Sequence, residues 1–193
     1  MTVDEVTTVF AVLATAGALA VVGLLAALLV PATRPAVRTA LAGQGWALAW
    51  LVAAAATLGS VYLSEVANFP PCRLCWAQRA AMYPLVVLLA LGGLGRVGAA
   101  RVVGLVLAGV GLVVNLWHVA VEIRPSLEGA ACDPTNPCSI RWVEQLGFWT
   151  IPRMATVAFA LVIITLANDL ATHRSTATFA HGPSTRTLED SLS

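Results

Sequence analysis

The chain alternates long apolar runs with short polar links. Five runs approach the length of about 20 residues that crosses a bilayer as a helix. They cover about 6–30, 43–63, 76–94, 102–121 and 151–170. The first run follows Asp4 and Glu5 and is longer than the apolar core of a signal peptide, so we expect a retained helix. The pattern predicts an all-α membrane protein with five spans.

The polar links differ in length and composition. "PATRPAVR" breaks the pattern after the first run with Pro31 and Pro35, and "GRVGAAR" is a short link before the fourth run. A mostly polar segment, 122–150, precedes the last run. The segment 171–193 is rich in Ser, Thr and His without apolar periodicity, and we expect it to be a disordered tail. The sequence shows neither a second soluble domain nor an internal repeat.

The overall composition agrees with a membrane location. Hydrophobic residues make up 59% of the chain and charged residues 11%, and the mean hydropathy is +0.83. A soluble domain carries about 25% charged residues. The basic residues are all arginine and are scattered along the chain. We therefore expect the lipid bilayer as a partner and no nucleic acid.

The four cysteines fall in two pairs that share one side of the membrane. Cys72 and Cys75 lie between the second and third runs, and Cys132 and Cys138 lie between the fourth and fifth. Two crossings separate the two links, so both must face the same compartment. This parity does not depend on the first run, because that run precedes both pairs.

Arginines in the opposite links indicate which compartment this is. Arg34 and Arg38 lie in one such link, and Arg96 and Arg101 lie in the other. By the positive-inside rule these links are cytoplasmic. The cysteines are then expected outside the cytoplasm, where disulfides persist.

The Cys-x-x-Cys spacing of Cys72 and Cys75 allows several chemistries. It can be a redox pair, half of a zinc site or a haem attachment site. Haem attachment needs His after the second cysteine, where this chain has Trp76. Four cysteines on one face can bind zinc, although the five-residue spacer of "CDPTNPC" fits poorly. A purely structural disulfide also remains open.

The residues around the first pair favour redox chemistry. Pro70 and Pro71 stop the preceding helix, so the next one should begin near Cys72 or Cys75. A helix N-terminus lowers the pKa of a cysteine. Arg79 lies one turn beyond Cys75 on the same face, so we expect a thiolate at Cys75. The alternative is that Arg79 only anchors the helix end at the interface.

The second pair lies in a different setting. "ACDPTNPCSI" contains Asp-Pro and Asn-Pro, which are turn formers. Cys132 and Cys138 are therefore expected on an exposed, bent loop, where a disulfide is accessible to a soluble thiol. With one pair at the membrane surface and the other in solvent, the arrangement suits a relay between a soluble protein and a lipid-soluble molecule.

Polar residues inside the fourth run form another candidate site. Asn115, His118 and Glu122 fall on one helical face near its outer end. His118 is a candidate to hydrogen-bond a quinone carbonyl or to shuttle a proton. The alternative is an interhelical hydrogen bond that holds the bundle together, which we favour for Asn115. For Glu122 the alternative is a position at the water interface.

Two motifs resemble a known family. "PPCRLCWAQR" followed by "AAMYPL", and the later "GFWTIP" that opens the last run, are similar to the DsbB/BdbC disulfide bond formation proteins. The resemblance covers about 43–170 and implies a four-helix transmembrane bundle around a quinone. The chain then divides into an extra N-terminal helix with its cytoplasmic link (1–40), the bundle with two extracytoplasmic cysteine loops (41–170) and a cytoplasmic tail (171–193).

The resemblance also implies an activity. It implies a thiol:quinone oxidoreductase of the bacterial inner membrane, which reoxidises an extracytoplasmic thioredoxin-like partner of the DsbA type. Electrons would pass to the quinone pool, with menaquinone or ubiquinone as the cofactor. The alternative is a membrane protein that binds a metal through its four cysteines without redox turnover.

The family's residue roles can be carried over by motif. Cys72 and Cys75 would be the quinone-coupled pair, with Cys75 against the quinone. Arg79 would support Cys75, and Gln78 and His118 are further candidates for quinone binding. The loop pair would meet the partner, with Cys132 forming the mixed disulfide and Cys138 as the released thiolate.

Overall fold

The regular elements among the described residues are helices. The computed structural model describes residues 2–93 and 99–180, apart from the side chains of 131 and 173–180. Two short 3-10 turns lie in the last loop. The elements are α1 (Val3–Leu29), α2 (Arg34–Leu41), α3 (Gly45–Glu65), α4 (Arg73–Gly93), α5 (Ala100–Ile123), η1 (Pro125–Leu127), η2 (Gly129–Ala131) and α6 (Ile151–Ala180).

The five long helices correspond to the five predicted apolar runs. Each of α1, α3, α4, α5 and α6 is long and apolar enough to cross a membrane. Large apolar side chains such as Leu58, Val87 and Val113 lie on the outer surface. A soluble monomer rarely exposes apolar patches of this extent, whereas lipid solvates them. The all-α membrane fold class is therefore confirmed.

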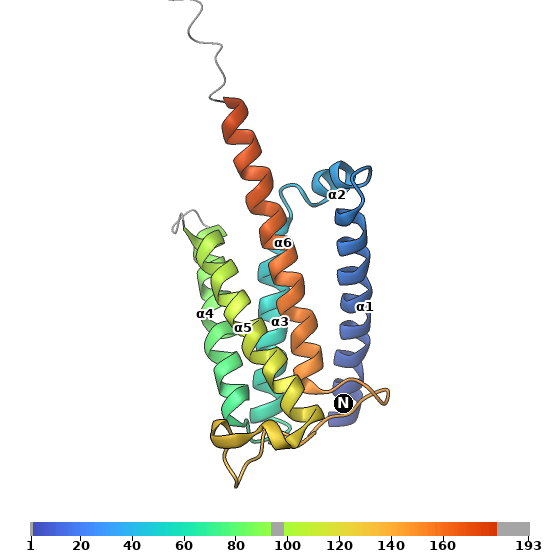
Figure 1. Ribbon diagram of the computed structural model, residues 1–193, viewed down its shortest axis with the longest axis vertical. Coiled ribbons are helices and arrows are strands. Elements are labelled where there is room, and N and C mark those ends of the chain that lie inside the picture. Colours follow the sequence, from blue (N-terminus) through green and yellow to red (C-terminus); the bar gives the residue numbers. More distant parts are fainter. Residues whose placement is uncertain (1, 94–98, 181–193) are drawn as a thin grey trace, which may run out of the picture.

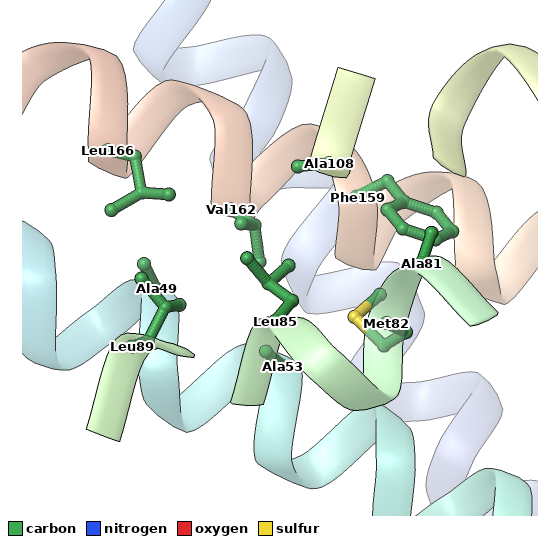
Figure 2. Close-up of a cluster of buried hydrophobic side chains, with 10 residues drawn as sticks. All are labelled: Ala49, Ala53, Ala81, Met82, Leu85, Leu89, Ala108, Phe159, Val162 and Leu166. Carbon is green, nitrogen blue, oxygen red and sulfur yellow. The ribbon is translucent and has the colours of Figure 1, made fainter. Parts of the chain in front are cut away.

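Four of these helices form a closed bundle. Around the bundle, α3 packs on α4, α4 on α5, α5 on α6, and α6 on α3, while α1 packs on the outside against α6 (Figure 1). The centre is filled by large side chains of α4 and α6 that meet alanines of α3 and α5. Small residues allow such close helix contacts in a bilayer. Figure 2 shows this cluster: Ala49, Ala53, Ala81, Met82, Leu85, Leu89, Ala108, Phe159, Val162 and Leu166.

Both cysteine loops lie at one end of the bundle. The N-terminus, the turn from α3 to α4 and the long loop from α5 to α6 meet at this end, and α2 lies at the other (Figure 1). The parity deduced from five crossings is therefore confirmed. Arg34, Arg38 and Arg101 fall at the α2 end. Arg96 lies outside the described residues.

Two segments differ from the sequence-based expectation. The link after the first run contains a short helix, α2, with Pro35 in its first turn, where proline is tolerated because no helical N–H is needed there. Helix α6 continues to Ala180, so residues 171–180 are helical and not disordered as expected. This stretch contains three alanines and neither Gly nor Pro, so the helix can continue without any apolar periodicity. The rest of the expected tail lies outside the described residues.

Candidate functional site

Cys72 occupies the residue immediately before α4. The backbone N–H of Cys75 donates to the Sγ of Cys72 at 3.2 Å, and the N–H of Trp76 donates to the Cys72 carbonyl at 3.0 Å. The sulfur thus takes the place of the oxygen that usually accepts at a helix N-cap. The prediction that a helix begins near this pair is confirmed. The backbone N–H at this helix start, however, donates to the sulfur of Cys72 and not to that of Cys75, where the thiolate was expected.

The two sulfurs of the first pair lie close enough to exchange a proton or to form a bond. The Sγ atoms of Cys72 and Cys75 are 2.6 Å apart, and both residues are free cysteines. The pKa of the Cys72 thiol is lowered, first because the Cys75 side chain donates to it and further because of His118, against the opposing effect of burial. The structure therefore favours a thiolate at Cys72, whereas the sequence pattern favoured Cys75.

His118 connects the two cysteine pairs. The side-chain nitrogen of Gln78 donates to Nδ1 of His118 at 2.9 Å. The other ring nitrogen, Nε2, lies 3.0 Å from the carbonyl oxygen of Cys138 and 3.8 Å from the Sγ of Cys72. Because Nδ1 accepts, the proton of the neutral ring is on Nε2, which donates to the Cys138 carbonyl. A single imidazole N–H therefore faces both pairs.

The second pair is a disulfide that folds back onto the first. Cys132 and Cys138 are bonded, and the turn between them is closed by the N–H of Asn136 donating to the Asp133 carbonyl at 3.0 Å. The predicted turn is confirmed. The predicted exposure is wrong, because Cys132 is 6% and Cys138 1% exposed, and both pack in one cluster with Cys72.

Polar contacts on one side hold the disulfide loop against the start of α4. The side-chain nitrogen of Asn136 donates to the carbonyl oxygen of Pro71 at 3.2 Å. Arg73, the first residue of α4, pairs with Asp133 at 3.6 Å. Both contacts bridge the two cysteine-bearing segments directly, which explains how a polar loop can bury its disulfide.

The other side of the loop is tied to the end of α5. Glu122 is 4% exposed, accepts a hydrogen bond from the Thr150 hydroxyl at 2.9 Å and lies 3.0 Å from Nε of Arg141. The interpretation of Glu122 as an interface residue is therefore wrong. Asn115 donates to the Pro152 carbonyl at 3.0 Å, so the interhelical role favoured for it is confirmed.

A small pocket lies between the two pairs. Its volume is about 20 Å³, and its lining includes Cys72, Cys75, His118 and Cys138. A space of this size holds about one water molecule. Cys138 is thus the member of the second pair that faces the first pair.

A much larger cavity lies on the other side of Cys75. It has a volume of about 370 Å³, within the range of small-molecule sites. Its walls are mostly apolar side chains from α1, α3, α4 and α6. Its polar residues, in addition to Cys75, are Ser60, Gln78, Arg79 and Tyr83. The cavity is therefore an apolar space with a few polar groups in its walls.

The three candidate quinone ligands are divided between these two spaces. Gln78 and Arg79 line the large cavity, whereas His118 lines the small pocket. Arg79 donates from Nε to the Ser60 hydroxyl at 2.9 Å and from Nη2 to the Ser60 carbonyl at 3.0 Å. The guanidinium is therefore held by α3 and is not placed freely at the interface as a simple anchor would be.

Two polar residues of the cavity were not identified from the sequence. Ser60 positions Arg79, and the Tyr83 hydroxyl lies 3.4 Å from the Ser60 hydroxyl. Tyr83 follows Arg79 by one helical turn, which is a signal that could have identified it. Ser60 is one of several hydroxyl residues in its apolar run, and such serines usually bond within their own helix.

The four-cysteine metal site does not agree with this arrangement. The ligand atoms of Cys72, Cys75 and His118 all lie within 4.8 Å of one another, so three metal-binding side chains are close together. Cys132 and Cys138, however, are joined in a disulfide and offer no thiolate. These two residues therefore do not supply the second half of the postulated site.

Comparisons with known proteins agree with the redox interpretation. Residues 42–168 match the family described as "Disulfide bond formation protein DsbB". The chain is 39% identical over 116 residues to "Disulfide bond formation protein C" of Bacillus subtilis, covering 60% of this chain and 84% of the relative. It is 38% identical over 119 residues to "Probable disulfide formation protein" of Oceanobacillus iheyensis, a match that covers 61% of this chain and 82% of the relative.

A third relative is similar to a comparable length of the chain. It is "Probable disulfide formation protein" of Deinococcus radiodurans, 41% identical over 129 residues, covering 62% of this chain and 84% of the relative. No solved structure matches the chain. The matched region coincides with the four-helix bundle and both cysteine loops. The chain therefore belongs to the DsbB family of disulfide bond formation proteins, which are redox enzymes of the membrane.

Proposed function

We propose that the protein is a thiol:quinone oxidoreductase that reoxidises a thioredoxin-like partner of the DsbA type and passes the electrons to a membrane quinone. One observation carries this proposal. Cys75 lines both the small pocket that contains Cys138 and the large apolar cavity that contains Arg79. A sulfur between these two spaces can connect thiol–disulfide exchange with a lipid-soluble acceptor.

The proposed location is the inner membrane of a bacterium, with the cysteine end outside the cytoplasm. The three relatives come from bacteria. Arg34, Arg38 and Arg101 lie at the opposite end, which the positive-inside rule makes cytoplasmic. A disulfide between Cys132 and Cys138 also agrees with an oxidising compartment.

The proposed exchange begins at Cys132. A thiolate of the reduced partner attacks the Cys132 sulfur, the Cys132–Cys138 bond breaks and Cys138 leaves as a thiolate. Cys132 is the less buried of the two, and Cys138 faces the first pair. The second partner thiol then displaces Cys132, so the partner leaves as a disulfide. One dithiol has been oxidised, and two electrons now reside on the second pair.

The second exchange transfers these electrons inward. With the first pair oxidised, the Cys138 thiolate attacks Cys72, the Cys72–Cys75 bond breaks and Cys75 is released beside the large cavity. Cys132 then displaces Cys72 and restores the Cys132–Cys138 disulfide. The free Cys72 and Cys75 and the bonded second pair agree with the state that this step would produce.

His118 is proposed to stabilise the thiolate that leaves in this exchange. Its Nε2 atom lies 3.8 Å from the Cys72 sulfur and donates to the carbonyl of Cys138. The Nε2–H of the neutral ring can donate a hydrogen bond to the Cys72 thiolate as it leaves, and the ring keeps its proton in this role. Gln78 holds the ring in the tautomer that this role requires.

The residues around the large cavity fit a quinone. A quinone supplies an acceptor for two electrons and two protons and leaves as the quinol. The Arg79 guanidinium, the Ser60 hydroxyl and the Tyr83 hydroxyl form a polar group beside Cys75 that can hold a quinone oxygen. The apolar walls suit the ring and the tail of either menaquinone or ubiquinone.

The proposal is tested by measuring quinone reduction with the purified protein in detergent or nanodiscs. A reduced thioredoxin-like protein should drive loss of quinone absorbance, with one quinone consumed for each dithiol oxidised. Extraction of the purified protein with organic solvent should also release a lipid-soluble quinone. If the partner stays reduced while quinone is present in excess, the proposed function is wrong.

A further inference from the structure

The large cavity has one wall that comes from outside the family region. The family match begins at residue 42, whereas α1 ends at Leu29. Three residues of α1 nevertheless line the cavity: Phe10, Leu13 and Ala14. The helix that is additional to the family core is therefore in contact with the space in which that core would hold its acceptor.

Helix α1 is fixed to α6 by close packing of small residues. Ala11 and Ala14 are buried and pack in one cluster with Trp149. At Gly17, a Cβ atom would come within 2.8 Å of a methyl carbon of Val157. The backbones approach closely along this contact, which in a bilayer is a stable form of helix association. The position of α1 beside the cavity is thus set by packing.

The outer end of α1 is also attached to the loop that follows the second cysteine pair. Gln145 donates to the Asp4 carboxylate at 2.7 Å and to the Thr7 hydroxyl at 3.0 Å. The Thr8 hydroxyl donates back to the Gln145 side-chain oxygen at 3.3 Å. One glutamine side chain therefore holds the first two turns of α1 in register with the rest of the site.

Helices α3 and α6 pack closely against each other at the end of the bundle that is remote from the cysteines. A Cβ on Gly45 of α3 would lie 2.7 Å from the Thr165 carbonyl oxygen of α6. Nearer the cysteines, Gly59 of α3 faces the ring of Phe10 instead, and a Cβ on Gly59 would lie 3.5 Å from that ring. The ring of Phe10 also makes an edge-to-face contact with Tyr62, with centroids 6.2 Å apart. Phe10 thus bridges α1 and α3 beside the cavity.

Leu13 shows where the cavity approaches the lipid. Its side chain lines the cavity and is 62% exposed on the outer surface of the helices. It lies about one turn along α1 from Phe10, so the two side chains are neighbours. The cavity therefore extends to the lipid-facing surface beside α1, close to where Phe10 contacts α3.

We propose that α1 completes the quinone site, with Phe10 closing the cavity on its lipid side and the quinone entering between α1 and α3. This inference rests on the proposed function. The ring of the quinone would lie against Cys75 and Arg79, and its tail would leave past Phe10 and Leu13 into the bilayer. Helix α1 then contributes to the quinone-binding site and does not serve only as a membrane anchor.

The direct test is photolabelling of the full-length protein with an azido-quinone of short chain. Peptide mapping should find the label on the α1 peptide that contains Phe10 and Leu13, and an excess of unlabelled quinone should abolish it. Label confined to peptides of α3, α4 and α6, in a protein that reduces quinone normally, would overturn the role of α1 and leave the proposed function intact.

The kinetic test compares two variants of α1. Phe10→Ala should raise the KM for a short-chain quinone by about three- to tenfold, the effect of losing one aromatic contact. Val12→Ala removes a side chain that is 56% exposed on the same helix and should leave KM unchanged. Phe10→Leu keeps a large apolar side chain at this position, so it should retain most of the affinity for the quinone.

Both alanine variants should oxidise one equivalent of reduced partner through the two cysteine pairs at the wild-type rate, because α1 does not take part in thiol exchange. This readout also shows that the variants are folded. Equal KM values for Phe10→Ala and Val12→Ala would overturn the inference. A wild-type protein that reduces no quinone would overturn the proposed function and the role of α1 together.

Discussion

The side-chain amide of Gln78 lies 2.9 Å from Nδ1 of His118 and determines which ring nitrogen carries the proton. The two residues come from α4 and α5, so the contact also joins two helices of the bundle. Because Nδ1 is engaged as an acceptor, the Nε2–H is directed toward the Cys138 carbonyl and the Cys72 sulfur. The contact therefore links helix packing with the exchange between the cysteine pairs.

Replacing Gln78 by Leu should slow this exchange. The substitution removes the donor to Nδ1, so the ring is free to adopt the tautomer that carries no proton on Nε2. Loss of a residue that orients a metal-bound histidine typically costs about 10- to 100-fold in activity, and we expect an effect of similar size here. The measurement is rapid quenching and thiol labelling after mixing with one equivalent of reduced partner. Gln44→Leu, the same change at an exposed position near the far end of α3, should exchange at the wild-type rate.

The reduced first pair should show an unusual pH dependence at Cys72. The pKa of this thiol is lowered, chiefly by the hydrogen bond from Cys75, so its thiolate persists as the pH falls. An ordinary cysteine with a pKa of about 8.5 loses reactivity almost tenfold per pH unit below that value. Alkylation of Cys72, followed by peptide mapping, should therefore change little between about pH 8 and about pH 6.

The matched variant for this experiment is Cys75→Ala, which removes the main cause of the shift. Its Cys72 should regain a pH dependence closer to that of an ordinary thiol. A steep decline in Cys72 alkylation over the same range in the wild-type protein would contradict the placement of the thiolate at this residue.

Cys132 should be the residue that captures the partner. A partner whose second active-site cysteine is replaced can attack the loop disulfide but cannot resolve the product. Because Cys138 faces the first pair and Cys132 is less buried, the mixed disulfide should form on Cys132. Peptide mapping under non-reducing conditions identifies the cysteine that is bonded to the partner. An adduct found mainly on Cys138 would reverse the proposed order of attack.

Arg79→Ala should weaken quinone binding more than it affects thiol exchange. The guanidinium is held by Ser60 at the polar end of the cavity, where it can bind a quinone oxygen. Loss of one hydrogen bond to a charged group costs about 1.5–3 kcal/mol, or roughly 10- to 100-fold in KM. Arg73→Ala removes a largely exposed arginine that pairs with Asp133 and should leave the quinone KM unchanged. Unchanged quinone kinetics for Arg79→Ala would show that Arg79 does not bind the quinone and only joins α4 to α3 through Ser60.

Much of the fold followed from hydropathy alone, because lipid imposes a simple rule on helix length. Five apolar runs predicted five long helices, and the parity of crossings placed both cysteine pairs at one end. The short helix α2 was missed because Pro35 reads as a helix breaker, although it is compatible with the first turn. The extension of α6 to Ala180 was missed because a helix can continue without an apolar face.

The site was less predictable because it depends on contacts between distant segments. The Cys-x-x-Cys spacing indicated redox chemistry, but the burial of Cys138 needs Asn136 to reach the Pro71 carbonyl, and no local pattern shows this. The thiolate was placed at Cys75 because Arg79 is one turn away, yet Arg79 bonds to Ser60 of another helix. Phe10 gave no signal, since an aromatic residue in an apolar run resembles any lipid-facing side chain.

The most direct test of the central claim follows electrons through Cys75. Purified wild-type protein and the Cys75→Ser variant are mixed anaerobically with reduced partner and quinone, and quinone absorbance is recorded together with the redox state of the partner. The wild type should consume one quinone for each partner dithiol oxidised and turn over repeatedly. The variant should oxidise at most one equivalent of partner, through the Cys132–Cys138 disulfide, and reduce no quinone. Sustained quinone reduction by the variant would contradict a path of electrons through Cys75.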